Sequence, residues 1–210
     1  PAGGPAGRCA GEKNGHEGVK RTVTEDFRGI LVHDHEITFY RYGSAHQECH
    51  AHVERYLKDS MENESSLTWN RRMRELLQRM IHYRKEHTGE ASLDAQTVAG
   101  FETEYQEILD KAKEEYKRNE PSPYYREGYN LYRRMQEYKT EHLLFLHDMR
   151  VPTTNNTAER CLRDYKRKQT FAMTFRSLES IEELCHSKGV LLEVRKNNPN
   201  IYTSVMEIFN

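Results

Sequence analysis

The chain has 210 residues, of which 36% are hydrophobic and 31% charged, and its 32 basic and 33 acidic residues leave a net charge of −1. This length is enough for a compact domain with its own hydrophobic core, so disulfide bonds are not required for stability. The charge balance excludes a uniformly basic nucleic-acid-binding surface, and the absence of any run of about 20 apolar residues excludes an integral membrane protein.

The N-terminal segment and the cysteines bear on order and on cellular location. Residues 1–18 are rich in glycine and lack a periodic apolar pattern, so we expect this segment to be disordered. The four cysteines, at positions 9, 49, 161 and 185, lie far apart in a sequence without a recognisable export signal. Reduced thiols in a cytoplasm are therefore expected.

Two short strands are predicted after this segment. The apolar run from Ile30 to Val32 ends in polar residues, which is typical of a buried strand over about 28–34 that exposes Asp34 at its C-terminal end. A second and weaker strand is predicted at about 45–50.

Beyond Val53 the sequence pattern is typical of amphipathic helices, with sparse Leu, Met and Tyr among charged residues. Apolar side chains recur every three or four residues in two stretches, and a proline pair at 121 and 123 ends the second of them. A third helix is expected to end before Pro152. The three predicted helices span 67–81, 101–116 and about 125–146.

Cap residues are concentrated before the last part of the chain. Asn156 is followed three positions later by Glu159, the spacing of a capping box, so a helix is predicted from about Thr157 to Gln169. Two further helices are predicted at about 177–196 and 199–209.

Two carboxylates have surroundings that suggest chemistry, and each also has a structural explanation. Asp34 ends an apolar strand, where aspartate is commonly a turn residue. Glu159 lies in the first turn of a predicted helix, where glutamate commonly serves as a cap partner and favours the helix dipole. Taken singly, neither residue decides between the two interpretations.

His46, Cys49, His50 and His52 are metal-ligand residue types at close spacing. A structural zinc site usually recruits a second ligand pair at a distance, and no CxxC or HxxxH pattern follows. The spacing therefore favours partly buried, hydrogen-bonded histidines, with a zinc site as the alternative.

Three segments taken together and in order, 29–35, 46–55 and 152–163, closely resemble the insertion sequence 66 family of bacterial DDE transposases. The likeness runs from about Gly15 to Ile208, and its most specific part is the string Asn-Asn-Thr-Ala-Glu-Arg at 155–160. The resemblance implies an α/β to mainly α fold, in which strands near 28–34 and 45–50 belong to a partial ribonuclease-H-like core. Residues 19–54 and 148–210 would form this core with its C-terminal helices, and residues 55–147 would be a large helical insertion.

The resemblance also implies a chemistry, in which Asp34 is the second catalytic acid and Glu159 the third. Cleavage and strand transfer in DNA place negative charge on the attacking and leaving oxygens, which a pair of Mg²⁺ (or Mn²⁺) ions stabilises through hard carboxylate ligands. The two carboxyl groups are then expected within roughly 4–8 Å of each other. Residues implied to support this site without binding zinc are Cys49, His52, Asn155 and Asn156.

The first acid of the family does not appear where it is expected. It belongs on a separate, earlier strand, but Asp26 is the only aspartate that precedes Asp34, and it lies too close. We therefore expect the sequence to be a C-terminal part of a transposase catalytic domain that is inactive by itself. The alternative is a helical remnant that binds DNA or has a structural role, without catalysis.

A basic stretch supports contact with DNA, both transposon ends and target. Between 160 and 176 a single acid, Asp164, accompanies six basic residues, which favours contact with phosphates, although a solvated helix face is the alternative. These residues are Arg160, Arg163, Lys166, Arg167, Lys168 and Arg176. A second basic stretch lies at 71–85. The family further implies a homo-oligomer in a bacterial cytoplasm, associated with the nucleoid when bound to DNA and not with a membrane.

Overall fold

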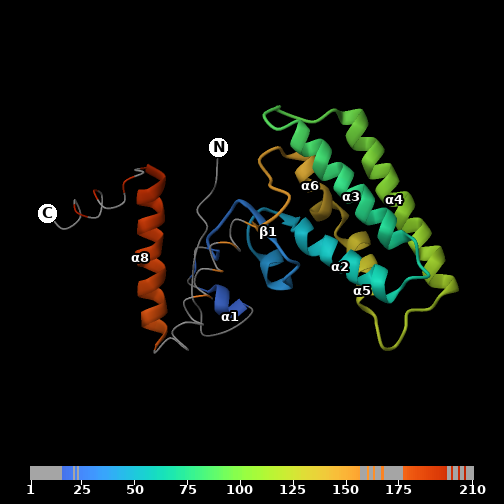
Figure 1. Ribbon diagram of the computed structural model, residues 1–210, viewed down its shortest axis with the longest axis horizontal. Coiled ribbons are helices and arrows are strands. Elements are labelled where there is room, and N and C mark those ends of the chain that lie inside the picture. Colours follow the sequence, from blue (N-terminus) through green and yellow to red (C-terminus); the bar gives the residue numbers. More distant parts are fainter. Residues whose placement is uncertain are drawn as a thin grey trace. The chain divides into compact units, whose positions relative to one another are not determined.

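The computed structural model describes residues 16–20, 22, 24–156, 160, 163, 167, 177–197, 200, 203 and 206. The chain divides into two compact units, one of residues 28–157 and one of residues 1–27 with 158–210. The described residues are mostly helical and contain one parallel sheet of two strands (Figure 1). The expectation of a mainly α fold is confirmed, whereas a ribonuclease-H-like core remains a prediction.

The sheet pairs β1 (Ile30–His33) with β2 (Ala45–Glu48) in parallel, and His33 stands opposite Glu48 at their C-terminal ends. Both predicted strands are confirmed, but the second ends at Glu48 because Cys49 caps the next helix. A short 3-10 helix, η1 (Ile37–Arg41), connects them. At Gly43 the backbone has φ +74°, and a Cβ atom there would lie 2.8 Å from the Gly29 carbonyl oxygen, so only glycine fits.

Five helices follow the sheet in unit 28–157. The helix predicted at 67–81 is confirmed, but it begins at Trp69 and continues to Glu86. The helix predicted at 101–116 is confirmed as part of a longer one, which Asp94 caps by accepting from the Thr97 amide at 2.7 Å. α2 packs against α3 and α5, α4 packs against α3 and α5, and α6 packs against β2. Their bounds are α2 (His50–Asn63), α3 (Trp69–Glu86), α4 (Ala95–Arg118), α5 (Glu127–Glu137) and α6 (Lys139–His147).

The prediction of one helix over 125–146 is wrong, because the chain breaks between α5 and α6 at Tyr138, where φ is −110° and ψ is 36°. No proline or glycine marks this position, so the sequence does not reveal the break. The reason is tertiary: the change of direction lets α5 pack against α2 and α4 while α6 packs against β2. The Tyr138 ring then lies against the rings of His35 and Tyr40, at centroid distances of 4.9 and 4.7 Å.

One hydrophobic core joins the five helices to the sheet. Its largest fully buried side chains are Trp69, Tyr105 and Phe145, from α3, α4 and α6. Ile30 and Val32 of β1 pack against the same cluster. Because the helices and the strand share this core, the C-terminal end of β1 has a fixed position relative to the helices.

The other unit contains α1 (His16–Val19) and α8 (Leu178–Asn197) among its described residues. α8 confirms the helix predicted at 177–196, and residues 16–18 of the N-terminal segment lie in the helical turn α1. Of the helices predicted at 157–169 and 199–209, the described residues 160, 163, 167, 203 and 206 are helical, and the others lie outside the described residues. No helix in the described part of the chain is long and apolar enough to span a membrane.

The core makes a stability prediction for Leu109, which is fully buried on α4. We expect Leu109→Ala to lower the free energy of unfolding by about 2–5 kcal/mol, because it removes apolar contacts and leaves a cavity. Lys113→Ala, at an exposed position of the same helix, should change it by less than about 0.5 kcal/mol. Urea unfolding followed by the fluorescence of Trp69, the single tryptophan, measures both values. Equal effects of the two substitutions would contradict the assigned core.

Candidate active site

Asp34 lies where the sequence predicts it, exposed and directly after β1. The backbone at this point is fixed to the neighbouring strand, because the Cys49 amide donates to the His33 carbonyl oxygen at 2.8 Å. His35 then turns the chain with a positive φ of 69°. The carboxylate of Asp34 is therefore accessible to solvent at the edge where β1 and β2 both end.

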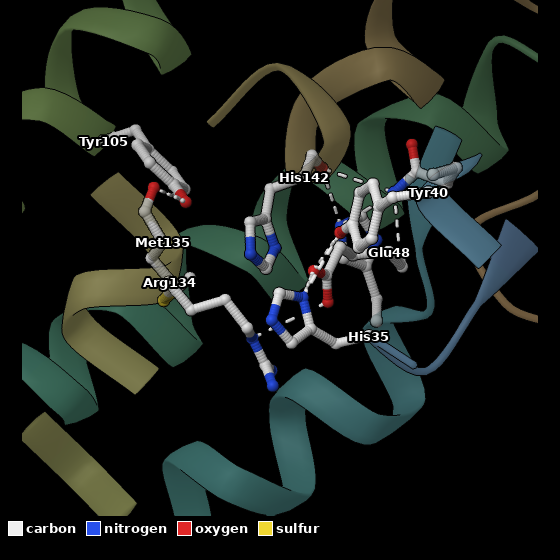
Figure 2. Close-up of polar contacts among 9 residues, drawn as sticks. His35, Tyr40, Glu48, Tyr105, Arg134, Met135 and His142 are labelled. Atoms are coloured by element: carbon white, nitrogen blue, oxygen red, sulfur yellow. Dashed lines mark hydrogen bonds and ion pairs between the residues drawn. The ribbon is translucent and has the colours of Figure 1, made fainter. Parts of the chain in front are cut away.

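Glu48 ends β2 at the same edge, but its side chain is buried, with 1% exposed. One carboxylate oxygen, Oε1, accepts hydrogen bonds from His35 Nδ1 and from the Tyr40 hydroxyl, the latter at 2.7 Å. The other oxygen, Oε2, faces Nε of Arg134 on α5 at 3.7 Å. Figure 2 shows these side chains directed at Glu48, with the ring of His142 nearby.

The electrostatics of this cluster favour an ionised glutamate. Burial by itself raises the pKa of Glu48, but the hydrogen bond from His35 and the positive charge of Arg134 outweigh burial and lower the pKa to about 2. Burial and the contact with Glu48 raise the pKa of Tyr40, so its hydroxyl keeps the proton that it donates. The cluster is therefore a charged carboxylate among donors at neutral pH.

The side chains of Gln47 and His50 connect the end of β2 to α6 through hydrogen bonds. The Gln47 side chain accepts from the Phe145 amide at 2.8 Å and donates to the Glu48 carbonyl oxygen at 2.8 Å. His50 Nε2 donates to the carbonyl oxygen of His142 at 2.8 Å. Since Gln47, His50 and His142 are fully buried, these contacts are shielded from water.

Cys49 and Asn155, predicted to support the site, meet although 106 positions separate them. The Cys49 thiol donates to Asn155 Oδ1 at 2.9 Å, and the Asn155 amide lies 3.4 Å from the sulfur. The His50 amide also donates to the Thr153 carbonyl oxygen at 3.0 Å. These contacts hold residues 153–155 at the end of β2. Asn156 is exposed, and its supporting role remains a prediction.

The cluster of histidines and cysteine does not converge on one point. His46 Nδ1 lies 3.3 Å from Nε2 of His33, whereas Cys49 contacts Asn155 and His50 contacts the His142 carbonyl. His52 lies in the first turn of α2, where its amide donates to the Cys49 carbonyl oxygen at 3.0 Å. Within the described residues, no three His, Cys, Asp or Glu side chains are grouped to hold a metal ion.

The other predicted site residues belong to the C-terminal part of the chain. Glu159 lies outside the described residues, so its approach to Asp34 remains a prediction, and the same holds for the positions of Lys166, Lys168 and Arg176. The three remaining predicted DNA-binding residues are exposed and helical. They are Arg160, Arg163 and Arg167.

Sequence reasoning missed the buried cluster around Glu48. A usable signal was present, because Glu48 is a charged residue within a predicted strand, and a charge buried there without a partner would be unstable. Its partners at 35, 40 and 134 are not identifiable by spacing, because Arg134 lies on a distant helix.

A family model described as "Transposase IS66 family" matches residues 12–183. No curated protein and no solved structure matches the chain significantly.

The buried histidine on α6 makes a prediction about pH. Burial lowers the pKa of His142 to about 3 from an ordinary 6.5, and neither ring nitrogen has a hydrogen-bond partner among the described residues. Below about pH 6.5 the unfolded chain therefore takes up a proton that the folded chain does not, and the free energy of unfolding falls as the pH falls. We expect His142→Gln to reduce this slope by up to about 1.4 kcal/mol per pH unit.

The slope is measured by urea unfolding at several values between about pH 7 and 5. Leu143→Ala is the control, because Leu143 is also buried on α6, and its loss should destabilise the fold without altering the slope. An unchanged slope in His142→Gln would show that His142 is protonated in the folded state.

Proposed function

Because the chain belongs to the IS66 family of transposases, we propose that it supplies the second and third catalytic acids, Asp34 and Glu159, of a DDE-type DNA transposase. The proposed reaction is metal-dependent cleavage and strand transfer in DNA. The proposed scaffold is part of a ribonuclease-H-like core, of which β1 and β2 are two parallel strands. The cellular setting proposed with it is a bacterial cytoplasm, where the protein associates with DNA as a homo-oligomer.

The observation that carries this proposal is the convergence of three segments at one sheet edge. Asp34 is exposed at the end of β1, the end of β2 is bonded to it through Cys49, and Cys49 contacts Asn155. Glu159 follows Asn155 by four residues, a length of chain that spans at most about 14 Å. This short connection supports an approach of the two carboxylates.

The donor types fit a hard divalent cation. Asp34 offers an exposed carboxylate, and Glu159 is of the same type, so these two residues would hold Mg²⁺ or Mn²⁺ with further oxygen ligands from another acid, water and DNA. The ions, when bound, supply positive charge for the attacking and leaving oxygens. Cys49 and Asn155 hold the end of β2 against the segment that leads to Glu159, and His52 and Asn156 are proposed to support the same segment.

The proposed DNA contacts come from the basic stretch that follows Glu159. Arg160, Arg163 and Arg167 are exposed and helical. Their spacings of three and four would put their guanidinium groups on one face of a continuous helix, which is suited to a row of phosphates. Lys166, Lys168 and Arg176 are proposed to extend this surface. The same observation favours the second candidate, a helical DNA-binding module without catalysis, which differs from the first in having no metal bound at Asp34.

Metal binding at Asp34 separates the two candidates. We expect Mn²⁺ to broaden the backbone amide signals of residues 33–36 in nuclear magnetic resonance spectra of the chain, and Asp34→Asn to remove this effect, because the substitution removes the anionic ligand. Asp110→Asn, at an exposed position of α4, is the matched control and should leave the broadening intact. Broadening that persists in Asp34→Asn would reject the assignment.

The salt dependence of DNA binding tests the basic surface. The logarithm of the binding constant for duplex DNA should fall linearly with the logarithm of salt concentration, and replacement of Arg160, Arg163 and Arg167 by alanine should reduce the slope by about 3, near 0.9 for each phosphate contact. A triple alanine variant of exposed Lys58, Lys111 and Lys113 is the charge-matched control and should retain the slope. Equal losses in both triple variants would mean that the contacts are not local.

Incubation of the chain with supercoiled plasmid and Mg²⁺ or Mn²⁺ tests catalysis, because a nick converts the supercoiled plasmid to the relaxed form. We expect this chain alone to bind the plasmid without nicking it, because two carboxylates fix too few oxygens around a metal pair. Nicking by the chain that is lost in an Asp34→Ala, Glu159→Ala variant would show that the chain is active by itself.

A further inference from the structure

Glu48 holds both ends of the turn that follows Asp34. His35, at the start of the turn, and Tyr40, within η1, donate to the same oxygen of the Glu48 carboxylate. His33, the residue before Asp34, accepts a backbone hydrogen bond from the Cys49 amide. Since His35 directly follows Asp34, the contact that fixes the His35 side chain also restricts the backbone that presents Asp34.

The backbone of His35 needs such support. Its φ of 69° lies in the left-handed region, which is unfavourable for a residue with a side chain. The contacts that stabilise it are the hydrogen bond to Glu48 and the rings of Tyr138 and Tyr40, at centroid distances of 4.9 and 5.6 Å. Loss of the carboxylate would remove the polar part of this support.

The second oxygen of Glu48 ties the turn to the helical segment. Arg134 of α5 faces it at 3.7 Å, and the side chain of Arg134 is 14% exposed. The guanidinium also lies over the Tyr56 ring of α2, 5.0 Å from its centroid. Removing one member of a buried ion pair leaves the other charge uncompensated, so the position of Glu48 depends on Arg134.

We propose that Glu48 is a positioning residue for Asp34: paired with Arg134, it holds the 34–40 turn through His35 and Tyr40 so that the Asp34 carboxylate is presented to a divalent cation. This inference rests on the metal-binding role of Asp34 proposed above. The helices between β2 and Asn155 then contribute directly to the site, because α5 carries Arg134, whose positive charge stabilises the Glu48 carboxylate.

The test compares Glu48→Gln with Glu64→Gln in the whole 210-residue chain. Glu64 is a matched control because it is a partly buried carboxylate that accepts from a tyrosine hydroxyl, Tyr116, but lies at the other end of α2. The first readout is hydrogen–deuterium exchange of peptides that cover residues 33–42. The second is the Mn²⁺ concentration that half-broadens the amide signals of residues 33–36.

For Glu48→Gln we expect exchange over 33–42 to rise about tenfold and the half-broadening Mn²⁺ concentration to rise by a similar factor, the size expected for losing a charged hydrogen bond. Exchange over 105–112, in the core of α4, should stay at the wild-type rate. Glu64→Gln should change neither readout at the turn.

Arg134 provides a second pair of variants. They test the positioning role of Glu48 if the Glu48→Gln protein does not fold. Arg134→Met removes the charge and should reproduce both effects, whereas Arg134→Lys keeps it and should restore wild-type values, because a contact of 3.7 Å depends on charge more than on guanidinium geometry. Circular dichroism establishes that each variant is folded.

The outcomes separate this inference from the proposed function. Folded Glu48→Gln or Arg134→Met proteins with wild-type exchange over 33–42 would overturn it, as would equal changes in Glu64→Gln. If Mn²⁺ leaves the wild-type signals of 33–36 sharp, the metal-binding role proposed for Asp34 fails, and with it the presentation of Asp34 to a cation. Increased exchange would in that case still establish that Glu48 holds the turn.

Discussion

The burial of one charged carboxylate constrains the sheet edge and the helices around it. An ion taken out of water loses several kcal/mol of solvation, so Glu48, 1% exposed, is stable only where donors and an opposite charge surround it. His35 and Tyr40 come from the connection between the strands, and Arg134 comes from α5. A single side chain therefore requires that the turn, the end of β2 and α5 keep one mutual arrangement.

Neutral polar contacts extend this arrangement to α6. Gln47 and His50 flank the charged cluster and bond to main-chain groups of Phe145 and His142, in surroundings where an unpaired polar group would be costly. The break at Tyr138 follows from the same requirement, since α6 must leave the direction of α5 to lie against β2. The junction between the sheet and the helices thus combines these specific polar contacts with the shared hydrophobic core, which Ile30, Val32 and Phe145 also contact.

A rigid sheet edge suits the chemistry proposed for this transposase-family chain. Carboxylates that share a metal pair must be held within narrow limits, and side chains at strand ends are positioned more precisely than those in long loops. Asp34 meets this requirement through the backbone bond of His33 to Cys49 and through the turn that Glu48 supports. The contact between the Cys49 thiol and Asn155 holds residue 155 at the same edge, which agrees with the positioning role proposed for these two residues.

The sequence by itself determined the elements whose signals are local. An apolar block located β1, and three- or four-residue periodicity located α3 and α4. The strand-end position of Asp34 followed from the same apolar block, and β2 and α8 were predicted as weaker elements. The motifs around Asp34, Cys49 and Asn155, taken in order, resembled the family that the family model then identified. Residue types and their order along the chain can be read without a structure.

Only the tertiary structure decided which distant residues meet. The contact of Cys49 with Asn155 and the pairing of Glu48 with Arg134 join positions far apart in sequence. The break at Tyr138 lets α5 and α6 pack against different elements. Periodicity reports which face of an element is apolar, and it carries no information about which polar side chain of another element will satisfy a buried charge. That choice is made when the helices pack, because only then does the interior fix the distance between each donor and its acceptor.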